Sequence, residues 1–254
     1  MKDIQPEKLR ILLIGYGKMG KAIETIATQR GHSITAIVSD KQMDVEHICR
    51  SYQPNIAFEF TSPEAAVQNL KGLISAGIPT VCGSTGWLSQ WNEIAHLVKE
   101  KNGSFFYASN FSMGMNLLFK LAELAGRFMN ELPDYDIDIA EIHHTEKKDI
   151  PSGTAITLAE KLIHEVTRKT AWVVNDKPEA GQIQISALRE PSVPGTHTIT
   201  FSSAIDTIEM SHTAHSRMGF ADGAVRAGEW LLGKKGIHSM DDFLKDRFRL
   251  KGGA

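Results

Sequence analysis

One short segment of the chain concentrates residues that could do acid–base chemistry on an anionic substrate. It runs from His143 to Thr154 and reads H-H-T-E-K-K-D-I-P-S-G-T. A histidine, with an unperturbed pKa of about 6.5, can give up a proton at neutral pH, and Lys147 adds a compact positive charge. Ser152 and Gly153 stand where a helix is expected to begin, so hydroxyl and N–H groups can converge there on an anion. The segment predicts a small, multiply anionic substrate and a proton donor.

The two adjacent histidines cannot both face one ligand if the chain stays extended there. Neighbouring side chains on a strand point to opposite faces, so only one of His143 and His144 should face the chemistry squarely. Any single histidine is more often a satisfied or solvated residue than a catalytic one. A solvated charged loop is therefore the alternative interpretation of this segment, but the whole cluster favours a site.

A second histidine pair, His212 and His215, could suggest a metal site. No cysteine or carboxylate stands at ligand spacing from them. Zinc sites use three or four such ligands, so no metal is predicted.

A glycine-rich loop of the pattern G-x-G-x-x-G is the strongest local signal near the N-terminus, and it comprises Gly15, Tyr16, Gly17, Lys18, Met19 and Gly20. The pattern is weak alone, but here it follows an expected buried strand and opens an expected helix. The first glycine would permit a tight turn, the second a close approach of backbone to a pyrophosphate, and the third close packing of helix on strand. We predict a dinucleotide-binding loop, with an ordinary strand–helix turn as the alternative.

Two charged residues after the second expected strand bear on the choice of dinucleotide. Asp40 stands at about the offset of a carboxylate that binds the adenosine ribose 2′-hydroxyl, which favours NAD. Lys41 could instead bind the 2′-phosphate of NADP. The sequence therefore predicts NADH and/or NADPH as cofactor and leaves the preference open.

Three further loops should lie at the carboxyl ends of parallel strands, where open α/β sheets bind their ligands. Each is rich in small or hydroxyl residues, and each alone is more often a plain turn. They are Phe60-Thr61-Ser62, Gly83-Ser84-Thr85-Gly86 and Ala108-Ser109-Asn110-Phe111. Together, at one edge of one sheet, they predict a groove for the cofactor.

The elements that must position these loops alternate between strand and helix over the first 110 residues. Apolar runs predict strands at 11–14, 34–38, 56–60, 80–82 and 105–107, and amphipathic stretches predict helices at 18–30, 45–52, 63–76 and 88–100. Such alternation produces right-handed βαβ units and a parallel sheet.

The pattern changes after Asn110. Helices are expected at 115–129 and 154–168, strands at 136–139, 183–188, 196–202 and 204–210, and a last helix at 221–232. Strands with little helix between them indicate an α+β segment with an open mixed sheet. Because no long linker is present, short hinges are expected near Asn110 and Arg217.

The overall composition is typical of a soluble globular protein. Of the 254 residues, 42% are hydrophobic and 23% charged, and the formal net charge of −2 lacks the basic excess of a nucleic-acid binder. No apolar run approaches the roughly 18 residues of a membrane span. Cys49 and Cys82 form no C-x-x-C pair, which predicts two buried, reduced thiols. We therefore expect a cytoplasmic protein without nucleic-acid or membrane partners.

Taken together, these motifs resemble the 4-hydroxy-tetrahydrodipicolinate reductase family, also called dihydrodipicolinate reductases, of the diaminopimelate route to lysine. The family signature H-H-x-x-K-x-D-x-P-S-G-T is matched from His143 to Thr154. The resemblance extends through E-F-T-S-P-E at 59–64, G-S-T-G at 83–86, N-F-S at 110–112 and S-R-M-G-F-A-D-G-A at 216–224. It therefore covers almost the whole chain.

This resemblance implies a fold and a set of roles. The fold would be α/β, with an N-terminal Rossmann-type parallel-sheet domain at 1–110 and 218–254, and an α+β substrate domain at 111–217 whose open mixed sheet builds a homotetramer. His143 would donate a proton, and Lys147 would be a second acid or a substrate anchor. The carboxylates of a small dicarboxylate substrate would be held by His144, Ser152, Gly153 and Thr154. The glycine-rich loop, Asp40, Lys41, the other three loops and Arg217 would hold the cofactor.

The reaction of that family agrees with these residues. Hydride delivered to carbon 4 of a conjugated cyclic imine leaves negative charge at carbon 3, which then needs a proton. A histidine can supply it, while cationic and N–H groups position the dicarboxylate over the nicotinamide. The expected activity is NAD(P)H-dependent reduction of 4-hydroxy-tetrahydrodipicolinate to tetrahydrodipicolinate.

Departures from the family pattern are small. Glu59 stands where the family usually has aspartate, and the family's glycine-rich loop often has one more residue. Pro191 replaces the first glycine of the family's R-x-G-x-x-x-G-x-H stretch, here at 189–197, which puts the local turn in question.

Two alternative functions stay open. One is a nicotinamide enzyme that acts on an amino acid, such as an aspartate or diaminopimelate dehydrogenase, although such an enzyme needs no Ser-Gly-Thr dicarboxylate turn. The other is a regulator that senses NADH, which would usually carry a basic DNA-binding module that this chain lacks.

Overall fold

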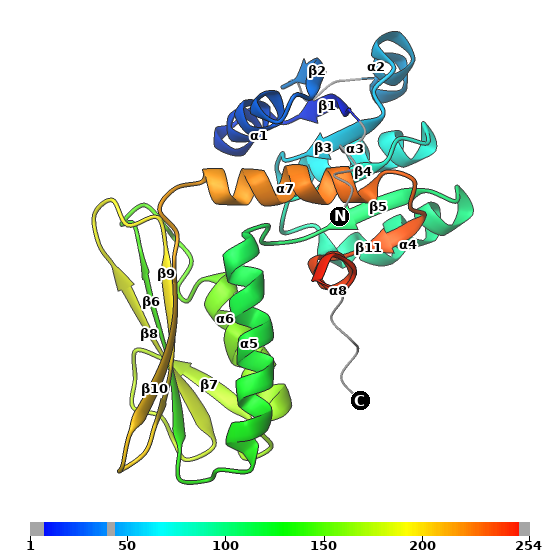
Figure 1. Cartoon of the computed structure of the whole chain (residues 1–254). Helices are drawn as coiled ribbons and strands as arrows, with labels where there is room; N and C mark the ends of the chain where they lie inside the picture. Colours follow the sequence, from blue (N-terminus) through cyan, green and yellow to red (C-terminus); the bar gives the residue numbers. More distant parts are fainter. Residues whose placement is uncertain (1–7, 40–43, 249–254) are drawn as a thin grey trace. The chain divides into compact units, whose positions relative to one another are not determined.

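The computed structural model describes residues 8–39 and 44–248, which form two compact units (Figure 1). The first unit holds the chain up to Ser112 and again from Met218, and the second is Met113–Arg217. The two junctions lie close to the hinges expected near Asn110 and Arg217. Within the described ranges, no helix is long and apolar enough to cross a membrane.

A six-stranded sheet forms the centre of the first unit, and every neighbouring pair in it is parallel. Its strands are β1 (Arg10–Ile14), β2 (Ser33–Val38), β3 (Ile56–Glu59), β4 (Thr80–Cys82), β5 (Ser104–Tyr107) and β11 (Gly236–His238). Their order across the sheet is β11-β5-β4-β3-β1-β2. Because β2 and β3 lie on opposite sides of β1, the direction of winding reverses there, and open α/β sheets bind ligands at such a point.

Helices cover both faces of this sheet (Figure 1). They are α1 (Lys18–Gln29), α2 (Val45–Tyr52), α3 (Pro63–Ser75), α4 (Trp91–Glu100), α7 (Met218–Leu231) and α8 (Met240–Phe248), with a short 3-10 turn, η1 (Leu88–Gln90), before α4. The residues of β1 and β3 are almost all fully buried, as expected for strands covered on both faces.

The second unit is a five-stranded mixed sheet covered on one face by two helices (Figure 1). Its elements are α5 (Met113–Asn130), β6 (Asp136–His143), α6 (Gly153–Glu165), β7 (Ala171–Val174), β8 (Gln182–Arg189), β9 (Thr196–Ser202) and β10 (Thr207–Thr213). The strand order is β10-β9-β6-β8-β7. β8 lies parallel to β6 and β7, whereas β9 runs antiparallel to β6 and β10.

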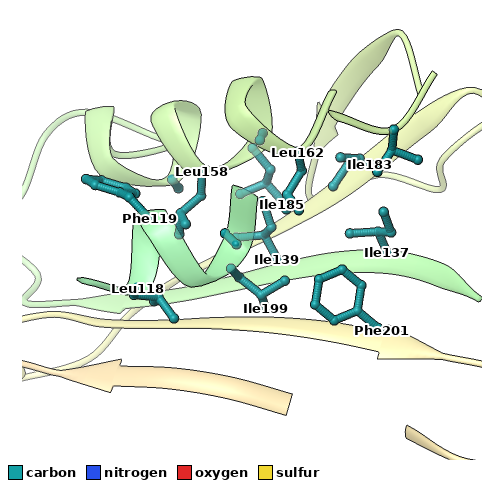
Figure 2. Packing of buried hydrophobic residues seen from close by; sticks show 14 of the residues in the cluster. Leu118, Phe119, Ile137, Ile139, Leu158, Leu162, Ile183, Ile185, Ile199 and Phe201 are labelled. Atoms are coloured by element: carbon teal, nitrogen blue, oxygen red, sulfur yellow. The ribbon is translucent and has the colours of Figure 1, made fainter. Parts of the chain in front are cut away.

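Alternating residues of these strands form the core under α5 and α6. Figure 2 shows Ile139, Ile185 and Ile199 from three neighbouring strands packed against helix residues such as Leu158. On β6 the buried residues are the odd-numbered ones from 137 to 143, so the even-numbered ones face the other side of the sheet. That side is not covered by a helix of this unit.

The structure confirms the expected fold class and corrects several bounds. β6 continues to His143 rather than ending at 139, because the alternation of buried and half-buried residues goes on to that position. The sequence did not predict this extension, since the buried residues there are polar. The strand expected at 204–210 lies at 207–213, because Ser203 Oγ accepts hydrogen bonds from the N–H groups of Ile205 and Asp206 and holds a turn there. β7, β11 and α8 were not expected, and the first two are too short to give a pattern.

Candidate active site

In the first unit, the loops expected to bind the cofactor lie side by side at the carboxyl edge of the sheet. Backbone hydrogen bonds connect them across neighbouring strands: Phe60 N–H to the Ile14 carbonyl (2.8 Å), Gly83 N–H to the Glu59 carbonyl (3.0 Å) and Ala108 N–H to the Cys82 carbonyl (3.3 Å). Thr61 N–H also donates to Ser84 Oγ (2.7 Å). The structure thus brings together the four predicted loops, which follow β1, β3, β4 and β5.

The glycines of the first loop have the geometry that a dinucleotide site requires. Gly15 has φ +94°, and a Cβ there would lie 2.1 Å from the Phe60 carbonyl oxygen. A Cβ on Gly20 would lie 2.2 Å from the Gly15 carbonyl oxygen, so this glycine permits the close approach of α1. A Cβ on Gly17 would meet nothing within 4 Å. Gly17 therefore leaves space at the N-terminus of α1, the place predicted for a pyrophosphate.

A buried carboxylate, Glu59, lies directly under these loops. It is fully buried, and its Oε1 accepts hydrogen bonds from Thr61 Oγ1 and from Asn69 Nδ2 (3.3 Å). Its Oε2 accepts from Cys82 Sγ (3.4 Å). Burial, together with the charge of Glu59, holds the pKa of the Cys82 thiol well above its usual range. Glu59, which replaces the aspartate usual in the family that the sequence resembles, thus connects the loop after β3 to β4 and α3.

The cofactor role of every residue in this set stays a prediction, and three of its residues lie outside the four loops. Asp40 and Lys41 lie outside the described residues. Arg217 is the last residue of the second unit and is exposed.

In the second unit, the end of β6 places His143 on the helix-covered face beside a buried carboxylate. His143 and Glu141 are two residues apart on the strand and therefore point to the same side. Both are buried, at 7% and 0% exposure, and His143 Nδ1 lies 3.4 Å from Glu141 Oε2. His144 follows the strand and is half-buried, so only His143 shares the core face of the strand.

Three other elements contribute a backbone N–H or a side chain to the surroundings of the Glu141 carboxylate. Oε1 accepts the backbone N–H of Ser152 at the start of α6 (3.0 Å) and the guanidinium of Arg189 at the end of β8 (3.2 and 3.3 Å). His197 of β9 approaches Oε2 at 3.6 Å through Nε2, which lies 3.2 Å from Ser152 Oγ. The rings of His143 and His197 meet edge to face, with centroids 4.9 Å apart.

These contacts fix the charge of the cluster. Burial alone would raise the pKa of Glu141, but the nearby rings of His143 and His197 and the hydrogen bond from Ser152 hold it well below its ordinary value, so the group is a carboxylate at neutral pH. Burial lowers the pKa of His197 despite the opposing effect of Glu141, so this ring is neutral.

The loop that follows β6 brings the predicted substrate residues to the N-terminus of α6. Ser152 caps the helix, its Oγ accepting the N–H of Ala155 at 3.2 Å. Lys147 Nζ binds Asp149 Oδ2 at 2.9 Å. Burial would raise the pKa of Asp149, but the hydrogen bond from Lys147 and the N–H of Gly153 lower it. Gly153 and Thr154 are the first residues of α6, and Lys147 binds the Asp149 carboxylate on the segment that leads into this helix end.

Glu141, His143 and His197 also place three ligand atoms within 4.8 Å of one another, as a metal site would. The Glu141 carboxylate, however, is already paired with Arg189, whose charge would oppose a dication beside it. The cluster is therefore better suited to holding and moving a proton than to binding a metal.

Glu141, Arg189 and His197 belong to the site but were not predicted as site residues from the sequence. One signal was present: Glu141 continues the period-two alternation of Ile137 and Ile139, which predicts a charged residue on a buried face. Arg189 and His197 stood in a stretch recognised for its resemblance, but only strand pairing brings them beside Glu141 and His143.

Comparison with known proteins gives one consistent result. Residues 9–111 match the family described as "Dihydrodipicolinate reductase, N-terminus", and residues 114–244 match "Dihydrodipicolinate reductase, C-terminus". A protein of Christiangramia forsetii named 4-hydroxy-tetrahydrodipicolinate reductase is 43% identical over 95% of this chain and 100% of its own length. A protein of the same name from Methanoregula boonei is 36% identical over 79% of each chain.

Among solved structures, the dipicolinate-bound dihydrodipicolinate reductase of Paenisporosarcina sp. TG-14 has a similar fold. Its TM-score is 0.78, with 20% identity over 92% of this chain and 98% of the other. At that identity, the likeness supports the fold alone.

Proposed function

This chain belongs to the dihydrodipicolinate reductase family, and from that membership we propose that it catalyses the NAD(P)H-dependent reduction of 4-hydroxy-tetrahydrodipicolinate to tetrahydrodipicolinate. It is thus an oxidoreductase of lysine and diaminopimelate biosynthesis. The two alternatives, an amino-acid dehydrogenase and an NADH-sensing regulator, have no support from the family matches over residues 9–111 and 114–244.

The chemistry divides into the loss of water and a two-electron reduction. Loss of water from the 4-hydroxy compound gives a conjugated cyclic imine, and the product then requires a hydride at carbon 4 and a proton at carbon 3. A reduced nicotinamide, when bound, supplies the hydride. The protein must hold the dinucleotide, hold a dicarboxylate and deliver one proton.

The first unit provides the residues that would hold the cofactor. The space beside Gly17 and the N-terminus of α1 fit a pyrophosphate, and the loops after β3, β4 and β5 lie along the same sheet edge. We assign to this role Gly15 to Gly20, Thr61, Gly83 to Thr85, Ala108 to Phe111 and Arg217, with Asp40 and Lys41 binding the adenosine ribose or its phosphate.

The second unit provides the proton and the anion site. His143, buried beside a carboxylate, would donate the proton to carbon 3. Lys147, His144, Ser152, Gly153 and Thr154 would hold the substrate carboxylates. The proposal depends chiefly on one geometric feature: a histidine with a carboxylate partner stands at the end of β6, on the segment that leads through Lys147 to the N-terminus of α6.

We also assign the working form as a cytoplasmic homotetramer that forms through the uncovered face of the second sheet. Two observations support this assignment. Both cysteines are free and buried, as in a reducing compartment, and the mixed sheet has helices on one face only.

A coupled assay tests the function. The substrate is generated enzymatically, and oxidation of NADH and of NADPH is followed by absorbance. We expect turnover with both cofactors, with affinities within about tenfold (about 1.4 kcal/mol), because Asp40 and Lys41 favour different cofactors. Absence of turnover with both cofactors would overturn the function. A thousandfold difference in affinity between NADH and NADPH would overturn only the prediction that the enzyme uses both.

A further inference from the structure

Glu141 is a buried carboxylate with one oxygen saturated and the other without a hydrogen bond. Oε1 receives the Ser152 N–H and two contacts from the Arg189 guanidinium. Oε2 is buried and has no hydrogen-bond partner of good geometry. A buried charged oxygen without a donor is costly, so Oε2 requires a donor from a neighbouring group.

The matching donor is the Nδ1 of His143. It too is buried without a hydrogen bond, and it lies 3.4 Å from Oε2. His197 Nε2 is slightly farther from Oε2, at 3.6 Å, and has Ser152 Oγ as a partner at 3.2 Å. The gap of 3.4 Å exceeds the 2.7–3.2 Å of a formed N–H···O bond. Catalytic hydrogen bonds are often long before substrate binds and shorten in the complex.

This arrangement leaves Nε2 as the nitrogen of His143 that can reach a ligand. The side chain keeps 9% exposure although Nδ1 is buried. A Cβ on Gly195 would lie 3.0 Å from Nε2, so the absence of a side chain at position 195 keeps space beside that nitrogen. The two nitrogens of the ring thus have different surroundings: Nδ1 faces a carboxylate, and Nε2 faces a glycine.

We propose that Glu141 is a positioning residue for His143: its Oε2 accepts the Nδ1–H of the ring and thereby holds Nε2 as the nitrogen that delivers the proton to substrate. This assignment rests on the proposed function, because it gives His143 the role of proton donor. The step conserves charge and atoms. The imidazolium loses its Nε2 proton to carbon 3 and becomes the neutral Nδ1–H tautomer, while Glu141 remains a carboxylate.

The charged groups around His143 decide the direction of the pH effect. Glu141 is the anion beside it on β6, Arg189 of β8 pairs with the other oxygen of that carboxylate, and His197 of β9 faces the ring. Ser152 at the start of α6 is uncharged, and His212 of β10 lies opposite His197. The Glu141→Gln change removes the only negative charge in this set and leaves Arg189 uncompensated. It should therefore make protonation of His143 harder.

A double-variant cycle separates positioning from a general structural effect. We expect Glu141→Gln to lower kcat by about 10- to 100-fold with KM nearly unchanged, which is less than the ~10²–10⁴-fold of a whole general acid. The same change added to His143→Gln should lower kcat no further, because Glu141 acts through that ring. Glu160→Gln, an exposed carboxylate on α6, is the matched control and should retain the parent kcat.

The pH profile gives a readout that a merely structural role would not move. The donor must be protonated, so kcat falls at pH values high enough to deprotonate it. In Glu141→Gln this falling limb should move to lower pH, and Glu141→Asp, which restores the charge, should move it back. An unshifted limb in a folded Glu141→Gln protein would contradict the proposal.

A measurement on the unaltered protein covers the case in which Glu141→Gln does not fold. In protein labelled with ¹⁵N-histidine, the neutral form of His143 should be the Nδ1–H tautomer, and an Nε2–H tautomer would overturn the proposal. Near-normal kcat in His143→Gln would overturn the proposed donor itself. An inactive His143→Gln beside a fully active Glu141→Gln would remove the positioning role alone.

Discussion

His143 combines a buried ring with one nitrogen beside a carboxylate, which is the environment of a proton donor rather than of a solvated surface histidine. We predict that His143→Gln lowers kcat by about 10²–10⁴-fold, because general acid catalysis is lost. KM should change little, since the ring is not assigned to either carboxylate. Steady-state kinetics measures both constants, and titration with NADH should show unchanged affinity because the change lies outside the glycine-rich loop.

Lys147 has a different role, because its ammonium group already holds a carboxylate. It binds Asp149 at 2.9 Å, and a substrate carboxylate would compete for the same charge. We predict that Lys147→Ala raises KM by about tenfold or more, the effect of losing a hydrogen bond to a charged group, and also lowers kcat. Lys148→Ala, an adjacent exposed lysine, is the control and should leave both constants close to the parent values. An unchanged KM in Lys147→Ala would leave the lysine as an acid only.

The site could be predicted from the sequence only as far as its residues lie in one segment. His143, Lys147 and Ser152 fall within one short stretch, so residue type and spacing indicated them. Glu141 and His197 are opposed across β6 and β9, and His143 and Arg189 across β6 and β8. Such pairs depend on strand order and register, which a single sequence does not determine.

At the scale of elements, the loop between β1 and α1 gives a clean test of the cofactor site. We predict that Gly17→Ala weakens NADH binding by at least about tenfold (about 1.4 kcal/mol), because the new methyl group would occupy the space left for the pyrophosphate. The fold should be retained, since that Cβ meets nothing within 4 Å. Calorimetric titration and thermal unfolding measure the two effects.

The control for this test is Gly103→Ala, also in the first unit. A Cβ there would make only ordinary contacts, the nearest at 3.5 Å, so cofactor affinity should not change. Gly15→Ala is a poor probe, because positive φ and the 2.1 Å approach to Phe60 would disturb the loop itself. Undiminished affinity in a folded Gly17→Ala would place the pyrophosphate elsewhere.

A partly buried ion-pair network connects α1 and its C-terminal turn to α7. Glu229 accepts two hydrogen bonds from Arg30 (2.7 and 2.8 Å), and its Oε1 lies 2.8 Å from His32 Nε2. Because His32 Nδ1 accepts the Leu9 N–H, the proton lies on Nε2 and is donated to Glu229. Burial would raise the pKa of Glu229, but Arg30 and His32 lower it below 4.5.

We predict that Glu229→Gln lowers the free energy of unfolding by about 2 kcal/mol at pH 7, the effect of weakened hydrogen bonds to a charged group. A carboxylate whose pKa is lowered on folding contributes stability above its unfolded pKa and loses it as pH falls through the folded value. The difference between parent and variant should therefore shrink below about pH 4.5. Urea unfolding at several pH values measures the difference in free energy of unfolding between parent and variant. Glu93→Gln, which removes an exposed carboxylate, is the control and should have little effect. A difference that does not depend on pH would contradict the ionic role of Glu229.

At the scale of the whole molecule, the fold class could be read from the sequence because two periodicities divide the chain. Continuous apolar runs such as Ile11–Ile14 separated by amphipathic stretches indicated the parallel sheet, and alternation in the second part indicated a sheet with one uncovered face. The extent of β6 and the position of β10 could not be read. β6 continues with polar residues on its buried face, so the pattern of apolar residues does not show where it ends. The start of β10 is decided by side-chain hydrogen bonds in the turn before it.

The uncovered face of the second sheet carries the prediction that the working form is a homotetramer. Along β6 and β9 this face presents Ala140, Ile142, Thr198 and Thr200, small or β-branched side chains that can pack against a second sheet about 10 Å away. We expect sedimentation equilibrium at micromolar protein to give the mass of four chains.

Ala140→Arg, in the central strand, should give smaller species while retaining the circular-dichroism spectrum, because it places a charge where another copy would pack. Glu160→Arg, a charge change on exposed α6, should leave the mass at four chains. A parent protein that sediments as a stable monomer would contradict the tetramer, and an Ala140→Arg protein that stays tetrameric would move the interface away from this face.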